Sequence, residues 1–403
     1  MASPIIVERG VYHSNADTTL VRDVSEDMLL LEPDQSPLLV LTNKNNRKDP
    51  SDTPKFQWFE KTEVAIWDTV GTVGATASTT ETTMYVTDYT LYAVGDVLLF
   101  PQAATVATGE ELALISAVAT TGIITVSRGY AGSTVQAVAS GQSVRILCSA
   151  LTEGGAVTAV RSQAPVAKTS YCQIFRTPVD VSRTMQATKA YASPEGKRIE
   201  GQVEALRRHK QEIESAGLWS KGTESLAAGG SSWATLGVKP TIATNITNGA
   251  TTFTITKFND FCETAFRYGA TEKLLMAAPK IISAMNYFSQ NKLLTSNGDK
   301  TFGVAIQRVL GNGFGEFLLA NNFRMGDAPS STNGFTDEAY SIDLPNVRYR
   351  YLNGNGNSQD TKLFSDVKKD GYARNIDEYY SQVGWEVRHE LKHARIHNVT
   401  SYS

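Results

Sequence analysis

The sequence predicts an α+β fold that carries a small all-β domain as an insertion in its first half. Three observations predict this arrangement. Residues 193–219 (SPEGKRIEGQVEALRRHKQEIESAGLW) form the longest helical pattern of the chain. Residues 83–147 contain several short strand patterns and little charge, and they are rich in Val, Thr, Ala and Gly. Longer strand patterns lie on both sides of this region and near the end of the chain, so strands are expected outside the insertion as well.

Composition sets the broad class. The chain has 403 residues with 41% hydrophobic residues, 20% charged residues and a net charge of −3. These values are typical of a folded soluble protein of two or three domains, and any contact with nucleic acid should be weak and local. The three cysteines lack CxxC spacing, which indicates a reducing compartment without a disulfide framework. Neither a signal-peptide pattern nor a run of 18 apolar residues is present, so we expect no cleavable export signal and no membrane partner.

Residues 1–47 are expected to form an arm. Within them, a short amphipathic segment from Leu20 to Leu41 contains the apolar run 28–31 and is interrupted by Pro33 and Pro37. This segment has too little apolar mass for a core of its own. We therefore expect the arm to lie against a larger surface.

A β ribbon is expected next. Residues 55–67 (KFQWFEKTEVAIW) are aromatic and β-branched, and the best antiparallel partner is the distant segment 170–182 (SYCQIFRTPVDVS). Two strands alone are marginally stable in water, so the ribbon should rest on its own body or on a neighbouring molecule.

Between these strands lies the predicted insertion, residues 77–150. Its five strand patterns are residues 84–86, 97–100, 112–115, 123–126 and 144–147. Turns are predicted at Gly95, Gly109, Gly122 and Gly141. Five strands at this spacing can form a small closed or nearly closed β barrel, and the Gly/Thr/Ser-rich flanks at 71–80 and 152–155 are typical of flexible joints.

The long helix is predicted from Ser193, a suitable N-cap, to Trp219. Its narrow apolar stripe consists of Ile199, Val203, Leu206 and Ile213. Two opposite-charge pairs stand four residues apart, Glu204 with Arg208 and Lys210 with Glu214. With so narrow a stripe, the helix should lie across a surface rather than inside a core. The cationic run 207–210 is expected to be a solvated face that could touch a phosphate backbone without reading sequence.

The second half of the chain mixes both element types. Residues 258–268 and 279–294 are predicted helices, and residues 317–320 are a predicted strand. Residues 377–401 show strand alternation at Tyr379, Ser381 and Val383 and again near Trp385.

Few residues suggest chemistry. His389, Glu390 and His393 match the H-E-x-x-H pattern of zinc hydrolases, although β-branched and basic residues interrupt the helix that this pattern requires. A solvated strand or helix edge is the alternative. Glu110 and Glu111 could pair as carboxylates but are expected to face solvent, and the glycines of 311–315 are expected to form a turn. No phosphate loop, nucleophile elbow or dinucleotide fingerprint is present. We therefore expect no enzyme, no catalytic residue and no cofactor or metal.

The order of these elements resembles a known family. The resemblance is carried by residues 173–218 (QIFRTPVDVSRTMQATKAYASPEGKRIEGQVEALRRHKQEIESAGL), 309–327 (VLGNGFGEFLLANNFRMGD) and 385–401 (WEVRHELKHARIHNVTS). In these segments and in their order, the chain resembles tailed-bacteriophage major capsid proteins of the Hong Kong phage fold, and most closely the Su-ten podophage group. The insertion resembles a small β module of phage structural proteins through VTDYTLYAVGDVLLF and ITVSRGYAGSTVQAVASGQSV.

The resemblance implies a domain plan for the chain. It comprises an N-terminal arm (1–47), an E-loop ribbon (48–76 and 151–182), the inserted β domain (77–150), a P-domain with the spine helix 193–219 (183–230 and 335–403), and an A-domain (231–334).

The resemblance also implies a function in which copies assemble as hexamers and pentamers into an icosahedral virion shell around double-stranded DNA. The candidates for contacts between subunits are Phe56, Trp58, Ile66, Ile174, Phe175, Arg207 and Arg208. Implied partners are a separate scaffolding protein, a portal protein and DNA bound without sequence specificity, and assembly would take place in the host cytoplasm. An encapsulin-like compartment, a zinc hydrolase and a carbohydrate-binding module in residues 83–147 remain the alternatives.

Overall fold

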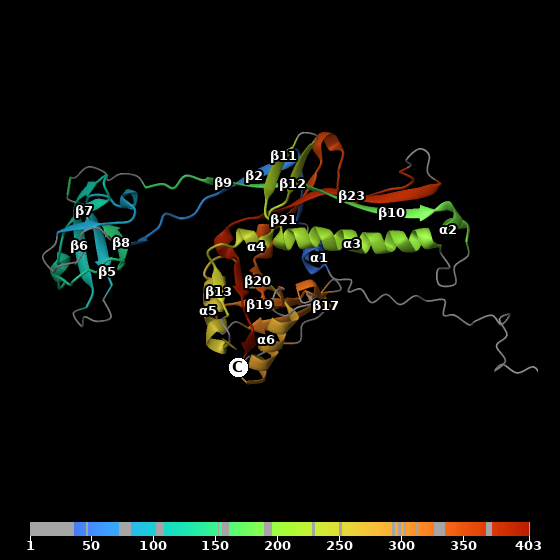
Figure 1. Cartoon of the computed structure of the whole chain (residues 1–403). Helices are drawn as coiled ribbons and strands as arrows, with labels where there is room; N and C mark the ends of the chain where they lie inside the picture. Colours follow the sequence, from blue (N-terminus) through green and yellow to red (C-terminus); the bar gives the residue numbers. More distant parts are fainter. Residues whose placement is uncertain are drawn as a thin grey trace, which may run out of the picture. The chain divides into compact units, whose positions relative to one another are not determined.

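A computed structural model of the chain shows two compact units (Figure 1). The first comprises Met1–Trp58 and Lys168–Ser403, and the second comprises Phe59–Ala167. The structure describes residues 36–45, 47–71, 82–101, 109–151, 153–154, 161–188, 196–227, 230–249, 252–291, 295–296, 300–301, 304–310, 313–325, 335–367 and 373–402. Residues 1–35 of the predicted arm, the predicted cap Ser193, residues 72–80 of the first predicted joint and residues 152 and 155 of the second lie outside these ranges. The predicted α+β class is confirmed.

A five-stranded sheet forms the centre of the first unit, and helix α3 (Lys197–Trp219) runs along it (Figure 1). Its strand order is β1 (Lys48–Ser51), β21 (Val347–Leu352), β23 (Arg374–Val387) and β10 (Gln173–Ser182), with β22 (Lys362–Phe364) also paired to β23. Strands β10 and β23 are antiparallel along the whole of β10. The strand predicted around Tyr379 and Trp385 is therefore confirmed.

The predicted ribbon pairing is wrong over most of its length. Strand β2 (Lys55–Glu60) pairs with β9 (Val166–Tyr171), whereas β10, which holds most of the predicted partner segment, pairs with β23. Phe175 and Thr177 of β10 are buried, with 6% and 1% of their surface exposed. Burial against a helix and a wide sheet stabilises β10 more than a two-stranded ribbon could.

Helix α3 confirms the predicted long helix but begins at Lys197, not at Ser193. Gly196 precedes it with a φ of 96°, a backbone conformation that favours glycine and closes off the helix. The predicted apolar stripe is wrong in its first half, because Ile199 and Val203 are 46% and 47% exposed. The buried residues of the helix are Ala205, His209, Ile213, Glu214, Gly217 and Leu218. Small and polar residues therefore occupy much of the face that contacts the sheet.

The two predicted ion pairs on α3 are also wrong. Arg208 instead lies 3.9 Å from Glu212. Glu214, predicted to pair with Lys210, is 4% exposed. Its carboxylate accepts hydrogen bonds from the backbone N–H of Leu39 at 3.2 Å and from the side-chain amide of Asn322 at 3.1 Å. Burial raises the pKa of Glu214 to about 8.

Helix α1 (Pro37–Lys44) is the described part of the predicted arm. Pro37 begins the helix instead of breaking it, because a residue in the first turn needs no N–H partner. Leu38, Leu39 and Leu41 are buried in one core with Ile213 of α3 and with the sheet. This part of the arm therefore packs on its own chain.

An eight-stranded sheet forms the other half of the first unit. Its order is β13 (Ile246–Asn248), β24 (Ala394–His397), β20 (Ala339–Ile342), β15 (Glu272–Ala277), β19 (Glu316–Asn321), β18 (Val304–Leu310) and β16 (Thr295–Ser296), with β17 (Lys300–Thr301) on β18. Helices α5 (Ile255–Phe266) and α6 (Pro279–Asn291) share an aromatic-rich core with it. Both helices and strand β19 confirm the elements predicted there. Strands β20 and β24 come from the segment 335–403 that the sequence assigned to the other domain.

Short elements complete the first unit. They are α2 (Arg183–Ala187), α4 (Val238–Thr241), the pairs β11 (Thr223–Ala227) with β12 (Gly230–Ala234) and β14 (Thr252–Phe253) with β25 (Ser401–Tyr402), and the 3₁₀ turns η3 (Phe323–Met325), η4 (Phe335–Asp337), η5 (Leu344–Asn346), η6 (Gly354–Gly356) and η7 (Glu390–Lys392). Among the described residues, no helix combines the length and apolar character needed to span a bilayer.

The second unit is a small β barrel. Its strands follow the order β3 (Trp67–Thr69), β8 (Ser143–Ser149), β5 (Asp96–Phe100), β6 (Glu111–Ala119), β7 (Ile123–Ser127) and β4 (Thr83–Tyr85), with the turns η1 (Tyr89–Leu91) and η2 (Tyr130–Gly132). A bridge between Val70 and Val86 joins the two edge strands and closes the sheet. All five predicted strands are present, and the four predicted turn glycines have φ between 81° and 92°. The sixth strand, β3, comes from the end of the predicted ribbon strand 55–67.

Candidate interaction surfaces

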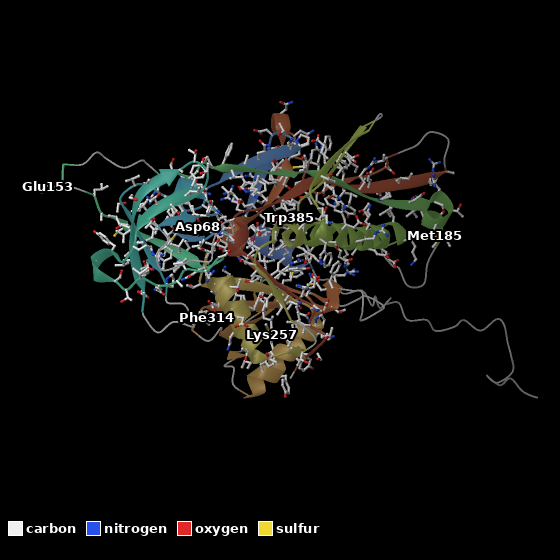
Figure 2. The ribbon with its side chains drawn as sticks, turned by 60° about the vertical axis from the view of Figure 1, so that its left-hand side comes forward. Asp68, Glu153, Met185, Lys257, Phe314 and Trp385 are labelled. Carbon is white, nitrogen blue, oxygen red and sulfur yellow. The ribbon has the colours of Figure 1, made fainter. Side chains whose placement is uncertain are left out.

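Trp385 fixes helix α3 on the central sheet. It is 1% exposed and lies beside the helix (Figure 2). Its indole N–H donates to the carbonyl oxygen of Ile213 at 3.2 Å, and its ring meets Tyr349 edge-on with centroids 5.6 Å apart. A Cβ added at Gly217 would lie 2.6 Å from two atoms of the indole ring. Only glycine fits there, so helix and strand approach closely at this point.

A buried histidine joins the middle of α3 to two strands. His209 is 0% exposed. Its Nδ1 lies 2.9 Å from the hydroxyl of Thr177 on β10, and its Nε2 lies 2.6 Å from the hydroxyl of Ser381 on β23. Burial lowers the pKa of His209 to about 4, so the imidazole is neutral at physiological pH.

This histidine predicts how stability depends on pH. Since the folded-state pKa lies below the ordinary value of about 6.5, the unfolded chain binds a proton first as the pH falls. We expect this proton uptake at His209 to lower the free energy of unfolding by about 2–3 kcal/mol as the pH falls from 6.5 to 4.5. Urea unfolding across this range should give a shallower pH dependence for His209→Gln than for the parent chain.

His393 supplies a control, because burial also lowers its pKa to about 4. His393→Gln should by itself reduce the pH dependence of the free energy of unfolding. In the double variant His209→Gln, His393→Gln, the two reductions should add. Identical slopes for the parent chain and His209→Gln would contradict the assignment.

Polar contacts anchor the first turns of α3. The guanidinium of Arg198 donates two hydrogen bonds of 2.6 Å to the Asp377 carboxylate on β23, and Gln202 donates a third, also of 2.6 Å. Bonding to Arg198 lowers the pKa of Asp377 to about 2. Ile199 and Val203 lie nearly half exposed beside this anchor. This end of the helix is therefore held by charge and leaves apolar surface uncovered.

Two of the predicted contact residues on the ribbon are covered within the chain. Phe56 and Trp58 are 9% and 7% exposed and form a cluster with Cys172. Their rings stack with centroids 6.2 Å apart. Burial raises the pKa of the Cys172 thiol to about 12. The two aromatic rings therefore have little surface left for a neighbour.

The other apolar candidates differ in exposure. Ile66, which precedes β3 of the barrel, is 49% exposed, and Ile174 on β10 is 43% exposed. Phe175 is only 6% exposed and lies in the main core of the first unit. Ile66 and Ile174 thus remain available for contact between copies, whereas Phe175 is already used within its own chain.

The cationic run on α3 is not one solvated face. Arg208 is exposed and Arg207 half-buried, but His209 between these residues and Lys210 is fully buried. The helical period turns His209 towards the sheet while its neighbours face outward. Of the two predicted contact residues in this run, Arg208 is exposed and Arg207 only partly so.

Three exposed apolar residues escaped the sequence analysis. Phe59 is 72% exposed, Val166 is 55% exposed and Trp67 is 46% exposed. Strand alternation supplies the missed signal for Phe59, because it lies on the opposite face of β2 from the buried Phe56 and Trp58. Phe59 and Val166 lie on the paired strands β2 and β9, and Trp67 lies on β3.

The zinc-hydrolase alternative at His389, Glu390 and His393 lacks the helix that its pattern requires. His389 has a φ of 55°, and only a three-residue 3₁₀ turn, η7, follows it, so the histidines do not share a helix face. A carboxylate oxygen of Glu390 accepts hydrogen bonds from the backbone N–H groups of Ala243 at 2.8 Å and Thr244 at 2.6 Å. His393 is 0% exposed, with its ring nitrogens near Asp343 N and Arg388 O. Within the described ranges, no three His, Cys, Asp or Glu side chains are placed to hold a metal ion.

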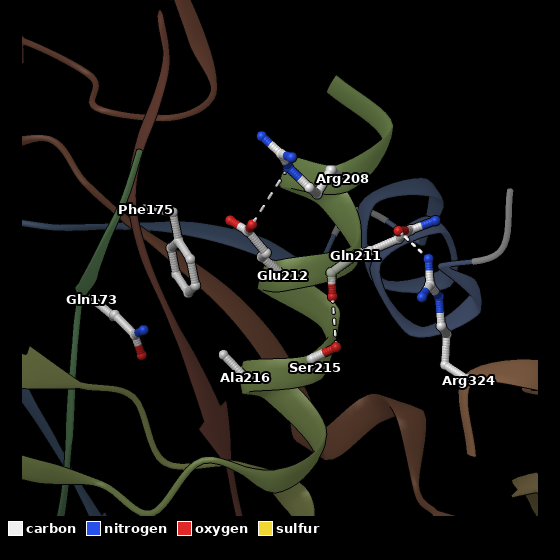
Figure 3. A pocket seen from close by; sticks show the side chains of 8 residues that line it. All are labelled: Gln173, Phe175, Arg208, Gln211, Glu212, Ser215, Ala216 and Arg324. Atoms are coloured by element: carbon white, nitrogen blue, oxygen red, sulfur yellow. Dashed lines mark hydrogen bonds and ion pairs between the residues drawn. The ribbon is translucent and has the colours of Figure 1, made fainter. Parts of the chain in front are cut away.

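An open groove of about 480 Å³ lies beside the second half of α3. Figure 3 shows Arg208, Gln211, Glu212 and Ser215 on the helix, with Phe175 on one side and Arg324 on the other. Arg324 donates to the side-chain oxygen of Gln211. The groove therefore combines two cationic groups, one carboxylate and an aromatic edge.

Comparison with known proteins decides which family carries this arrangement. A family model described as the SU10 major capsid protein matches residues 10–400. The chain belongs to this family. It is a phage-type major capsid protein, and the predicted resemblance to that family is confirmed. No curated protein matches the chain in sequence.

Solved capsid structures resemble this major capsid protein at low identity. The capsid of an empty GTA particle is 10% identical, with 94% of each chain covered and a TM-score of 0.43. Mycobacterium phage Bobi gives 10% identity, coverage of 94% of this chain and 96% of the other, and a TM-score of 0.44. The SrpI encapsulin of Synechococcus elongatus is 14% identical, with coverage of 60% of this chain and 79% of the other and a TM-score of 0.42. These TM-scores are below 0.5, so membership rests on the family match.

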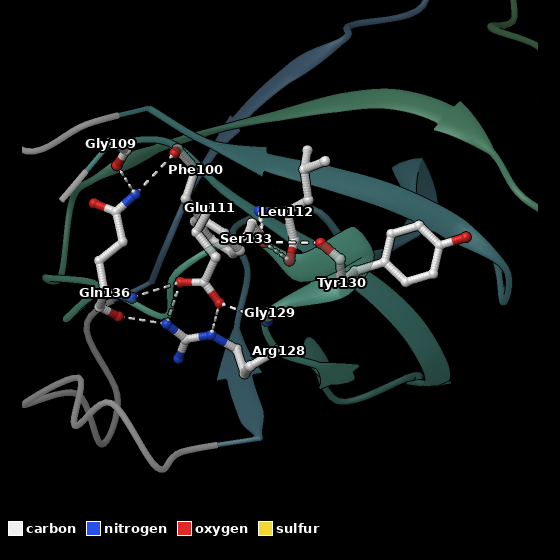
Figure 4. A network of polar contacts seen from close by, with 9 residues as sticks. All are labelled: Phe100, Gly109, Glu111, Leu112, Arg128, Gly129, Tyr130, Ser133 and Gln136. Atoms are coloured by element: carbon white, nitrogen blue, oxygen red, sulfur yellow. Dashed lines mark hydrogen bonds and ion pairs between the residues drawn. The ribbon is translucent and has the colours of Figure 1, made fainter.

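The barrel of this capsid protein contains a buried ion pair (Figure 4). Glu111 is 0% exposed, which corrects the expectation that it faces solvent. Its carboxylate accepts hydrogen bonds from Arg128 at 2.5 and 2.6 Å and from the backbone N–H of Gln136 at 3.0 Å. Arg128 also donates to the carbonyl oxygen of Gln136. The pair thereby fixes the loop that follows β7, whereas Glu110 is exposed.

Proposed function

We propose that this major capsid protein assembles as hexamers and pentamers into an icosahedral shell that encloses double-stranded DNA. The observation that carries the proposal is exposed apolar surface on a member of a capsid family. Phe59, Val166 and Ile174 lie on strands and keep 72%, 55% and 43% of their surface exposed. Side chains of this kind gain burial when another copy covers them.

The proposal assigns a role to each part of the chain. Residues 1–47 act as an arm, residues 48–76 and 151–182 as an E-loop that carries the β insertion (77–150), residues 183–230 and 335–403 as a P-domain, and residues 231–334 as an A-domain. Ile66, Ile174, Arg207 and Arg208 are its contact residues between subunits, together with the newly identified Phe59 and Val166. Helix α3 is the stiff element against which these contacts form.

The partners follow from the assembly. A separate scaffolding protein guides closure, a portal protein occupies one vertex, and DNA touches the inner surface without sequence readout. Assembly proceeds in the host cytoplasm and ends in the virion capsid. The net charge of −3 is consistent with weak contact between the chain and DNA.

Charge placed on the exposed apolar surface should block assembly. We expect the double variant Phe59→Asp, Ile174→Asp to lower the yield of closed particles at least about tenfold, because burying two unpaired carboxylates costs more than a tenfold equilibrium shift. Electron microscopy and gradient sedimentation of the chain, expressed with its neighbouring genes, measure the yield.

The double variant Phe59→Leu, Ile174→Val is the matched control, because it keeps both surfaces apolar and should still assemble. Wild-type chain that remains a small monomer at high concentration, even with its neighbouring genes, would refute the shell. Particles filled with a protein cargo instead of DNA would favour the encapsulin-like alternative.

A further inference from the structure

We propose that the chain deamidates spontaneously at Asn355, and that its fold directs this reaction to the exposed turn η6. The turn lies in the sequence NGNGN at residues 353–357, which places Gly356 directly after Asn355. Glycine hinders the reaction least, because it has no side chain beside the attacking nitrogen. The modification is a chemical property of the single chain, so it goes beyond the shell proposed above.

The reaction needs water as its only co-reactant. The backbone nitrogen of Gly356 attacks Cγ of Asn355, the new N–Cγ bond closes a succinimide ring, and the Cγ–Nδ2 bond breaks. The side-chain nitrogen leaves as ammonia and takes up the proton that the Gly356 amide loses. Water then opens the ring at Cγ to give aspartate, or at the backbone carbonyl carbon of Asn355 to give isoaspartate. No electron is transferred, and each event adds one negative charge to the net charge of −3.

The turn leaves this pair open to reaction. Asn355 and Gly356 are both exposed and have φ of 59° and 73°. A Cβ added at Gly356 would meet nothing within 4 Å, so the ring has room to form. Two backbone hydrogen bonds close the turn, Gly356 N to Asn353 O at 3.2 Å and Asn357 N to Gly354 O at 3.4 Å. Both are long, and a left-handed backbone is unfavourable for asparagine, so the turn opens at little cost in free energy.

A second Asn–Gly pair, on strand β13, is held much more firmly. Asn248 pairs with His397 of β24, and the N–H of Gly249 donates to the carbonyl oxygen of His397 at 2.8 Å. Gly249 is buried, and a Cβ added there would lie 2.6 Å from a methyl group of Val399. The attacking nitrogen of this pair is therefore bonded and enclosed. Its reaction requires β13 to leave the sheet, which costs more free energy than opening an exposed turn.

The third Asn–Gly pair in the described part of the chain directly precedes Asn355. The N–H of Asn353 donates to the carbonyl oxygen of Ser51 at 2.8 Å, which ties this residue to the end of β1. A Cβ added at Gly354 would lie 2.9 Å from the carbonyl oxygen of Asp52, so the backbone is confined there. Both residues of the pair are half-buried. Of the three pairs, only the one at Asn355 is exposed at both residues.

Site-resolved mass spectrometry of unassembled subunits tests the proposal. The chain is incubated in mildly alkaline buffer, which favours loss of the amide proton. Asn355 should deamidate at least about tenfold faster than Asn248 or Asn353, the ratio expected when the free energies of local opening differ by about 1.4 kcal/mol. The product should contain both aspartate and isoaspartate, with one atom of heavy oxygen when the water is labelled. In urea the three rates should become similar, because no fold then distinguishes the pairs.

Asn355→Gln is the matched control, because it keeps an amide in the turn but lengthens the side chain by one methylene group, so the five-membered ring cannot form. It should show no conversion at this position, while Asn248 and Asn353 keep their wild-type rates. Equal rates at the three sites of the native chain, a preference for Asn355 that persists in urea, or conversion of Asn355→Gln at the wild-type rate would each overturn the proposal. Subunits are tested before assembly, so the result does not depend on whether a shell forms.

Discussion

Trp385→Ala is expected to lower the free energy of unfolding of the first unit by about 3–5 kcal/mol, the range found when a buried tryptophan is truncated. The indole is 1% exposed and bonds the carbonyl oxygen of Ile213. The helix residue that faces the indole ring is Gly217. Because glycine has no side chain, the cavity left by the substitution can be filled from the helix only if the backbone shifts. Urea unfolding followed by circular dichroism measures the loss.

Trp233→Ala is the control for this variant. Trp233 is half-buried on the hairpin strand β12, with its indole bonded to Glu224 at 3.3 Å. Its truncation should cost about 1 kcal/mol, as for most substitutions outside a core. A loss below about 1.5 kcal/mol for Trp385→Ala would mean that α3 is held on the sheet chiefly by other contacts.

Glu111→Gln is expected to destabilise the barrel by about 3–5 kcal/mol, because it leaves the Arg128 charge buried without its counter-charge. The side chains of Glu111 and Arg128 are 0% and 6% exposed. Calorimetry of the full chain should show the lower unfolding temperature. Hydrogen exchange should quicken at the amides of Gly129 and Gln136, which both donate to Glu111.

Two variants isolate the charge effect. Glu110→Gln changes the exposed neighbouring carboxylate in the same way and should stay within about 0.5 kcal/mol of wild type. The double variant Glu111→Met, Arg128→Met removes both charges and should recover much of the loss, since an apolar pair of similar volume often replaces a buried ion pair at little cost. A double variant as unstable as Glu111→Gln would show that shape, not charge, accounts for the effect.

The sequence predicted local elements better than their partners. Alternation and turn glycines were sufficient for all five predicted barrel strands, because each barrel strand is bounded by its own turn signals. The pairing of β10 was missed, since the choice between β2 and β23 depends on Phe175 and Thr177 being buried under a helix far away in the sequence. Local pattern carries no information about such a long-range contact.

The face of α3 was missed for a related reason. The sequence predicts an apolar stripe, but His209 and Gly217 form much of the contact between α3 and the sheet. A buried histidine requires the Thr177 and Ser381 hydroxyls, and a buried glycine requires the Trp385 ring, and neither partner lies near in the sequence. The burial of Glu111 likewise depends on partners distant in the sequence, namely Arg128 and the loop after β7, which make it favourable. Ile66 and Ile174, by contrast, are exposed, as their proposed contact role requires.

The pairing of β2 with β9 has a practical consequence for engineering. Paired strands run about 4.8 Å apart, so the polypeptide leaves the ribbon and re-enters it at nearly the same point, between Glu60 and Val166. Any foreign module whose own ends lie that close together should be accepted in place of the barrel with the ribbon left undisturbed. The position between Glu60 and Val166 is thus suited to the insertion of an antigen or enzyme domain, one per copy of the chain.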